Sequence, residues 1–229
     1  MTEFFLPLHV HFCCRGDALV FLDLQKDSYT LVNGEASSIL RSMCSPNNVE
    51  MLDQKQIDIL EELVDVGLLT KNHDAGKHAS PTEIGLAMES LLDTEAPVEF
   101  RITTVHVWRF IAACTTAVVR LRWNRLEDTV QSVQLRKSCC FPKAPLPFAK
   151  ARELTAIFNR LRSFFPRNYL CLYDSLALIE FLARFQLFPT WVFGVKLEPW
   201  AAHCWVQEAP FTFNEGAEEA AGYTAVMTI

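Results

Sequence analysis

The segment from residues 9 to 33 alternates short apolar runs with polar turns. The runs HVHFCC, ALVFLDL and YTLV are separated by the turn-forming stretches RGD and QKDS. Alternation with a period of two residues, bounded by Gly, Asp and Ser, is typical of β-strands joined by hairpins. The pattern therefore predicts a small antiparallel sheet of three strands.

Two helices are predicted directly after this sheet. The first begins near Glu35, and the second runs from an N-cap at Asp53 to a stop at Gly67. Helical spacing places two apolar stripes side by side on the second helix. Either one stripe packs on the sheet while the other borders a groove for an extended peptide, or both are buried. The stripes are Ile57, Leu60 and Val64, and Ile59, Leu63 and Val66.

The second half of the chain reads as helices followed by strands. A stretch rich in Gly, Pro, Ser and charge, residues 71–96, marks a domain boundary. Helices are predicted over residues 98–123, over residues 150–165 and from Cys171 onward, with the prolines of CCFPKAPLPF excluding continuous helix where they occur. Four strand-like runs follow: TWVFGVKL, AHCWVQ, FTFNE and YTAVMTI. The chain is therefore predicted to be α+β, with helices and antiparallel sheet in each half.

Composition indicates a globular protein whose partner is a peptide or a small molecule. Hydrophobic residues make up 50% of the 229 residues, which is enough to bury a sizeable core. The formal net charge is −6, whereas binding to phosphates depends on clustered Lys and Arg. We therefore expect no nucleic-acid partner.

The sequence favours a protein of the reducing cytoplasm. Glu3 lies where a signal peptide carries basic residues, so secretion is not expected. No membrane partner is expected either, because ionisable residues interrupt the apolar run of residues 98–119. The eight cysteines include no Cys-x-x-Cys pair, which argues against a zinc ribbon and a disulfide framework, and no metal site is predicted.

Cys171 and His203 form a candidate nucleophile and base. Cys171 directly precedes a helix-patterned run, and the N-terminus of a helix lowers the pKa of a thiol. His203 lies one helix and one strand further along, where its imidazole can pair with the thiolate and later protonate a leaving amine. The alternative is that both residues belong only to the core.

The residue that orients the imidazole depends on the register of the hairpin after His203. A four-residue loop, Gln207 to Pro210, sets His203 opposite Asn214, whereas a loop one residue longer sets it opposite Glu215. Either side chain can accept a hydrogen bond from an imidazole N–H, and a carboxylate would also stabilise the imidazolium.

Two stretches of the chain resemble a known family of peptide-processing proteins. The blocks CLYDSLAL, FLARF, FGV and AHCWVQ resemble the signature of the lasso peptide B proteins, which are leader peptidases with a transglutaminase-like fold. The stretch DALVFLDLQKDSYTLVNGEASSIL is similar to the PqqD-like leader-recognition domain. The resemblance implies a winged-helix-like recognition domain at residues 1–72, a linker at 73–95, and a transglutaminase- or papain-like cysteine peptidase domain at 96–229.

The resemblance also implies roles for individual residues. Cys171 corresponds to the nucleophile and His203 to the general base and acid, while Glu215 replaces the Asp that the family uses as its third catalytic residue. A precursor's leader is implied to add as a strand near the second helix. The leader-binding residues would be Tyr29, Leu31, Val32, Ile59 and Leu63.

The implied function is removal of the leader from a lasso peptide precursor without any cofactor. The precursor peptide and an asparagine synthetase-like, ATP-dependent lasso cyclase that receives the core are the implied partners. Two other functions remain open: an acyl transferase of the transglutaminase type, which would use the same residues, and a leader-binding scaffold whose Cys-His pair is structural.

Overall fold

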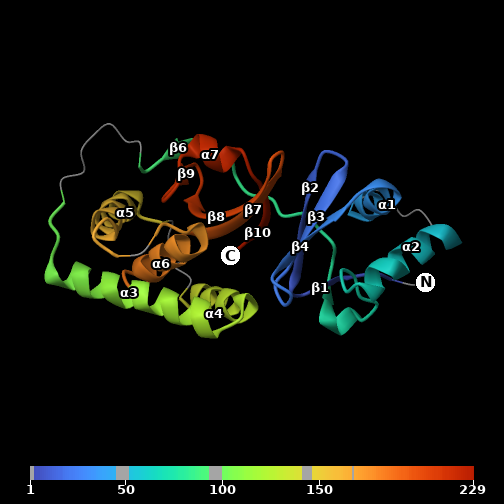
Figure 1. Cartoon of the computed structure of the whole chain (residues 1–229), viewed down its shortest axis with the longest axis horizontal. Coiled ribbons are helices and arrows are strands. Elements are labelled where there is room, and N and C mark those ends of the chain that lie inside the picture. The colour runs from blue at the N-terminus through green and yellow to red at the C-terminus, as the bar shows by residue number, and fades with distance from the viewer. Residues whose placement is uncertain (1–2, 45–51, 93–99, 141–145, 167) are drawn as a thin grey trace. The chain divides into compact units, whose positions relative to one another are not determined.

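The chain forms two compact units, each of which combines helices with strands (Figure 1). One unit comprises Met1–Glu83 and Thr224–Met227, and the other comprises Ile84–Tyr223 and Thr228–Ile229. The predicted α+β class is confirmed. The structure is a computed structural model that describes residues 3–44, 52–92, 100–140, 146–166 and 168–229.

The three-stranded sheet predicted near the amino end is present, and all its pairings are antiparallel. Its order is β2-β3-β4, with bounds Val10–Arg15, Ala18–Asp23 and Ser28–Val32. Gly16 occupies the turn between β2 and β3 at a φ of 57°, a conformation that glycine adopts without strain. A separate pair, β1 (Leu6–Pro7) and β5 (Gly76–Lys77), is also antiparallel.

The two predicted helices of this unit are α1 (Gly34–Cys44) and α2 (Gln54–Asp65). Asp53 caps α2 as expected: its carboxylate accepts a hydrogen bond from the Gln56 N–H, and the Gln56 side chain accepts one from the Asp53 N–H. Gly67 follows the helix at a φ of 83° and provides the predicted stop. The SPNN stretch after α1 lies outside the described residues.

Both apolar stripes of α2 reach the core of this unit. Leu60 from one stripe and Leu63 from the other are buried, and Ile57, Ile59 and Val64 pack partly buried around them. Only Val66, at the end of the second stripe, is largely exposed. Most of the surface of α2 that would border a groove is therefore already in contact with its own unit.

A five-stranded sheet dominates the carboxyl half, in the order β10-β7-β8-β9-β6. The four predicted tail strands are all present, although β9 is only two residues long. The fifth strand, β6, was not predicted and pairs parallel to β9. The bounds are Glu89–Ser90 for β6, Thr190–Leu197 for β7, Trp200–Glu208 for β8, Phe211–Thr212 for β9 and Thr224–Thr228 for β10.

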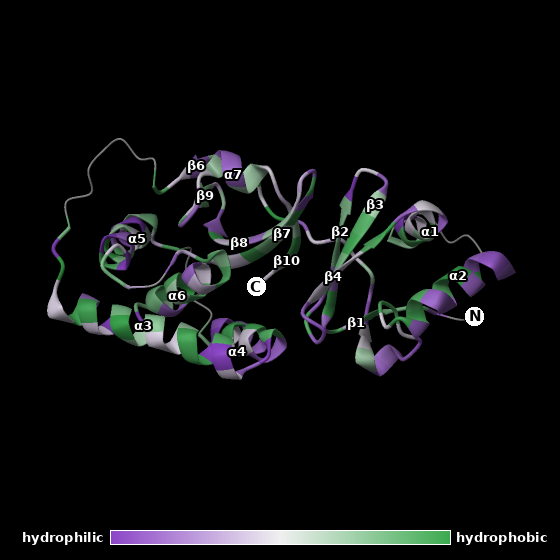
Figure 2. Cartoon of the chain, in the orientation of Figure 1, coloured by the Kyte–Doolittle hydropathy of each residue, from purple (hydrophilic) through white to green (hydrophobic). Residues whose placement is uncertain are grey.

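The helix that begins with Cys171, α6, is the central helix of this half. It packs against both β8 and α3, and every residue from Tyr173 to Ala183 is buried. A helix buried in this way is mostly apolar, and Figure 2 shows hydrophobic residues dominating α6 and the neighbouring β7. The buried carboxylates of α6, Asp174 and Glu180, are both paired with arginines. The helix bounds are Thr104–Trp123 for α3, Leu126–Cys139 for α4, Phe148–Arg162 for α5, Cys171–Ala183 for α6 and Ala217–Ala221 for α7.

The sequence misplaced the bounds of two helices and missed two others. The helix α5, expected over residues 150–165, spans Phe148–Arg162. The helix expected from residue 98 begins at Thr104, because Thr103 forms a capping box with His106 that fixes the first turn there. Residues 100–103 are not helical, and residues 98–99 lie outside the described residues. The helices α4 and α7 were not predicted. No helix among the described residues is both long enough and apolar enough to cross a membrane.

Candidate active site

Cys171 is the first residue of α6, as its position before an apolar run predicted. The residue before it, Leu170, is extended, and its side chain provides no cap to the helix. The N–H groups of a first helical turn have no partner within the helix and carry partial positive charge. A thiolate at Cys171 is therefore stabilised by its place in the fold.

A buried ion pair holds the segment that leads into α6. Asp174, which is 2% exposed, accepts a hydrogen bond from the Leu170 N–H at 2.7 Å and forms an ion pair with Arg162 of α5. The Arg162 guanidinium also donates to the carbonyls of Phe165 and Asn168 at 3.3 and 3.2 Å. One arginine thus ties α5, the connecting loop and the start of α6 together.

The strand β8 presents His203 within a group of aromatic rings. His203 stacks on Trp205 at 5.9 Å between ring centroids and contacts Tyr223 at 5.1 Å. Its partner across the ladder is Gly194 of β7. A Cβ on Gly194 would come within 2.7 Å of the Trp205 ring, so glycine leaves the space that this ring occupies. The aromatic groups restrict rotation of the imidazole, and no pattern in the sequence indicated that Tyr223 contributes.

Glu215 is the acidic partner of His203. Its Oε2 lies 2.7 Å from the imidazole Nε2, and the two side chains are only 20% and 13% exposed. The other carboxylate oxygen accepts from the Gly216 N–H at 3.2 Å. Because Glu215 faces Nε2, the ring nitrogen that remains for the Cys171 sulfur is Nδ1.

Both hairpin registers considered from the sequence are wrong. β8 and β9 pair Glu208 with Phe211 around a turn of only two residues, a register that neither alternative contains. The strand then ends early, and the Asn214 side chain accepts the Val206 N–H at 2.8 Å in place of a main-chain partner. The side-chain oxygen of Asn214 is therefore already bonded to β8. Glu215, which lies outside the paired residues of β8 and β9, contacts His203 instead.

The short β9 leaves the edge of β8 open beside Cys171. The sulfur of Cys171 accepts hydrogen bonds from the Cys204 thiol, the His203 imidazole and the Cys204 backbone N–H. Along a β-strand the N–H groups of successive residues point to opposite edges. The N–H groups of Cys204 and Val206, which are two residues apart, therefore point to the same edge of β8. The Cys171 sulfur thus lies against the part of the β8 edge that β9 does not pair with, beside His203 and Cys204.

These contacts separate charge between Cys171 and His203. Hydrogen bonds from the Cys204 thiol and from His203 outweigh burial and lower the pKa of Cys171 to about 4. Burial opposes a charged His203, but the hydrogen bonds to Cys171 and Glu215 raise its pKa to about 9. The hydrogen bond from His203 also lowers the pKa of Glu215. At neutral pH the resting site is a thiolate and imidazolium pair with an ionised Glu215 behind it.

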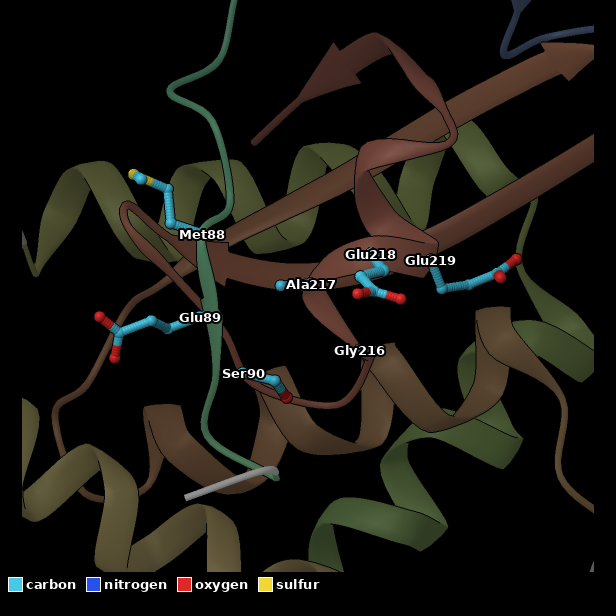
Figure 3. A pocket seen from close by; sticks show the side chains of 7 residues that line it. All are labelled: Met88, Glu89, Ser90, Gly216, Ala217, Glu218 and Glu219. Carbon is cyan, nitrogen blue, oxygen red and sulfur yellow. The ribbon is translucent and has the colours of Figure 1, made fainter. Parts of the chain in front are cut away.

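A pocket of about 570 Å³ lies alongside the segment that follows Glu215 (Figure 3). The Ser90 hydroxyl of β6 fixes this segment by donating to the Glu215 carbonyl at 2.8 Å. None of Cys171, His203 and Glu215 lines the pocket. Its lining residues are Met88, Glu89, Ser90, Gly216, Ala217, Glu218 and Glu219.

The five residues assigned to leader binding differ in exposure. Leu31 on β4 is 49% exposed, and Tyr29 and Ile59 are partly exposed, whereas Val32 and Leu63 are buried in the core. Of these five residues, Tyr29, Leu31 and Ile59 are therefore accessible to solvent, whereas Val32 and Leu63 are not.

The sheet of this unit has one edge that is better suited to an added strand. On β2, the Phe12 carbonyl already accepts a hydrogen bond from the Thr82 N–H at 3.2 Å. Within the described residues, β4 pairs only with β3. An unpaired strand edge offers a row of N–H and C=O groups to an extended peptide.

One comparison with known proteins matches the half of the chain that holds this site. The family model described as the transglutaminase-like superfamily matches residues 113–228 and includes Cys171, His203 and Glu215. No curated protein and no solved structure matches the chain. A domain of this kind supports activity as a thiol peptidase or as an acyltransferase. The chain belongs to the transglutaminase-like superfamily.

Proposed function

We propose that this chain is a cysteine peptidase that removes the leader from a lasso peptide precursor. The observation that carries the proposal is the charge-separated pair of Cys171 and His203, with Glu215 bound to the far side of the imidazole. The resemblance of the blocks around both residues to the lasso peptide B proteins supports the substrate class.

The geometry supports acylation of the thiol followed by hydrolysis. The Cys171 sulfur attacks the carbonyl carbon of the scissile bond, and His203 gives its proton to the departing amine, which leaves a thioester on Cys171. The neutral imidazole then takes a proton from water as the water attacks the thioester, which releases the leader's carboxylate and the free thiol. Glu215 holds the imidazole in place and stabilises its charged form.

Main-chain N–H groups supply the stabilisation of the tetrahedral intermediate in this proposal. The first-turn N–H groups of α6 have no partner within the helix, and the N–H of Cys171 is nearest to the carbon that its own sulfur attacks. We assign this N–H to the developing oxyanion.

Recognition of the leader is assigned to the amino-terminal unit. The open edge of β4 and the exposed side chain of Leu31 support addition of the leader as a further strand. We propose that residues 1–72 bind the leader, that residues 73–95 connect the two functions, and that residues 96–229 cut. The core peptide then passes to an ATP-dependent lasso cyclase in the cytoplasm, where structural disulfides are rare.

Changing Leu31 to glutamate is expected to weaken leader binding by about tenfold or more. An apolar contact of leucine size contributes roughly 1.5–3 kcal/mol, and a charge in its place adds a desolvation cost. Fluorescence anisotropy with a labelled leader peptide measures the effect. Leu135→Glu is the matched control, since Leu135 is an exposed leucine on α4. Equal weakening by both variants would contradict leader binding at β4.

The reaction itself is tested with a precursor peptide encoded beside the gene, incubated in ¹⁸O-labelled water. Hydrolysis places ¹⁸O in the new carboxylate of the leader fragment, and mass spectrometry detects it. Transfer to an added primary amine without ¹⁸O incorporation would instead identify an acyltransferase. Binding without cleavage, in the presence and in the absence of the cyclase and ATP, would identify a scaffold.

A further inference from the structure

A second sulfur lies against the nucleophile. Cys204 of β8 is 3% exposed, and its thiol and its backbone N–H both hydrogen-bond to the Cys171 sulfur. The Ser175 hydroxyl lies 3.4 Å from the Cys204 sulfur and closes the space behind it. The proposed peptidase reaction needs no second thiol at this place, because His203 and Glu215 supply all the proton transfers.

The position of Cys204 permits a covalent bond between the two sulfurs. The Ser175 hydroxyl donates to the Cys171 carbonyl at 2.7 Å and lies 3.4 Å from the Cys204 sulfur, so one side chain contacts both residues. The Cys204 thiol and backbone N–H also hydrogen-bond to the Cys171 sulfur. Disulfides require Cα atoms that are close together and side chains that point toward one another. The packing of α6 on β8 brings the two backbones together, and the contact between the thiols shows that the two side chains point toward one another.

Cys171 is also the cysteine that an oxidant would attack. It is only half buried, and its sulfur is ionised in the resting site, whereas burial raises the pKa of Cys13, Cys44 and Cys114. Cysteines that respond to oxidants are accessible, ionised and placed beside a second thiol.

We propose that Cys171 and Cys204 form a redox modification site, in which a hydroperoxide oxidises Cys171 and Cys204 converts the product to a disulfide. The inference does not depend on the identity of the peptide substrate, and it gives Cys204 the role of a resolving thiol. The disulfide blocks the nucleophile while it protects the sulfur from further oxidation.

The two steps balance. The Cys171 thiolate attacks one oxygen of hydrogen peroxide, the O–O bond breaks, and the products are a sulfenic acid and hydroxide. The Cys204 sulfur then attacks the Cys171 sulfur, the S–O bond breaks, and the departing hydroxide leaves as water with the proton of Cys204. Together the two cysteines lose two electrons and one peroxide is reduced, and the hydroxide of the first step leaves as water after protonation by solvent.

The test compares the full-length wild type with Cys204→Ser after treatment with hydrogen peroxide. Serine keeps a hydroxyl donor near Cys171 but cannot form a disulfide. Unreduced tryptic peptides are then analysed by mass spectrometry. The two cysteines fall on different tryptic peptides, because Arg184 and Lys196 lie between them. Cys140→Ser is the control, since it removes an exposed thiol of α4's end and leaves the pair intact.

The wild type and Cys140→Ser should give a linked peptide pair that dithiothreitol separates into two intact thiols. Cys204→Ser should instead accumulate sulfinic and sulfonic acid at Cys171, with roughly a tenth or less of the thiol recovered on reduction. A wild type that over-oxidises at Cys171 without forming the link, or a Cys204→Ser variant that recovers fully, would overturn the inference. Both readouts are masses, so they remain valid if the protein cuts no lasso precursor.

Discussion

Replacing Cys171 with alanine is expected to abolish the proposed leader cleavage while leaving leader binding intact. Loss of the nucleophile from a Cys-His or Ser-His site lowers kcat by on the order of 10⁵-fold or more, because no other group can form the acyl intermediate. Leader binding should survive because Leu31 and Tyr29, the proposed binding residues, belong to the other compact unit. Mass spectrometry of the precursor with time, together with leader anisotropy, measures both quantities.

The matched control for this variant is Cys139→Ala, which changes an exposed cysteine of α4. It should cleave and bind like the wild type. The assignment of Cys171 fails if Cys171→Ala cleaves within tenfold of the control, or if Cys139→Ala loses activity to the same degree.

Replacing Glu180 with alanine lowers the free energy of unfolding by about 3–5 kcal/mol, the cost of leaving buried charges without their partner. The Glu180 carboxylate on α6 is 2% exposed and forms ion pairs with Arg120, Arg136 and Arg184. These arginines come from α3, α4 and the end of α6, so a single carboxylate joins three helices. Urea denaturation followed by tryptophan fluorescence measures the loss.

An exposed ion pair provides the control for Glu180. Glu61→Ala removes the carboxylate that pairs with Lys71, and both of those side chains are about half exposed. It should change stability by no more than about 1 kcal/mol. Similar losses in the two variants would show that the buried cluster is not a main determinant of stability.

The Glu180 cluster also sets a dependence on pH. Burial opposes ionisation of Glu180, but Arg136 and the other arginines outweigh it and lower the pKa of the carboxyl group. A lowered folded-state pKa contributes stability at neutral pH that is lost as the pH falls below the unfolded value and through the folded one. Glu180→Ala should therefore reduce the acid sensitivity of the fold.

Elements with strong local signals were predicted correctly from the sequence. The Asp53 cap and the Gly67 stop define α2, and alternation between polar turns defines β2, β3 and β4, because the interactions concerned join residues close in sequence. Cys171 at the start of α6 belongs to the same class, since the apolar run that it precedes has to be buried.

Elements that depend on distant partners were not predicted. The apolar residues of α4 do not form a clear stripe along one face. Its position depends partly on the ion pair between Arg136 and Glu180, which lies on α6. β6 has only two residues and exists because β9 offers it a parallel edge. Neither partner can be identified from spacing along the chain.

The candidate site was only partly predictable for the same reason. Spacing along the chain suggested Cys171 and His203. The predicted hairpin registers were wrong, because the Asn214 side chain replaces a main-chain partner of β8. Glu215 reaches His203 through the fold of the chain after β9, not through cross-strand pairing. The positioning contacts of Arg162 and Tyr223 arise only in three dimensions.

The thiolate and imidazolium pair is tested most directly by the pH dependence of Cys171 alkylation with iodoacetamide, followed by peptide mass mapping. The pKa of about 4 for Cys171 and of about 9 for His203 mean that the thiolate persists throughout this interval. The rate at Cys171 should therefore stay nearly constant from pH 9 down to about pH 5 and fall only below it. In His203→Ala the fall should begin at a higher pH, because the imidazolium is gone. A wild-type rate that falls about tenfold for each pH unit below about 8.5, as for an ordinary thiol, would contradict the account.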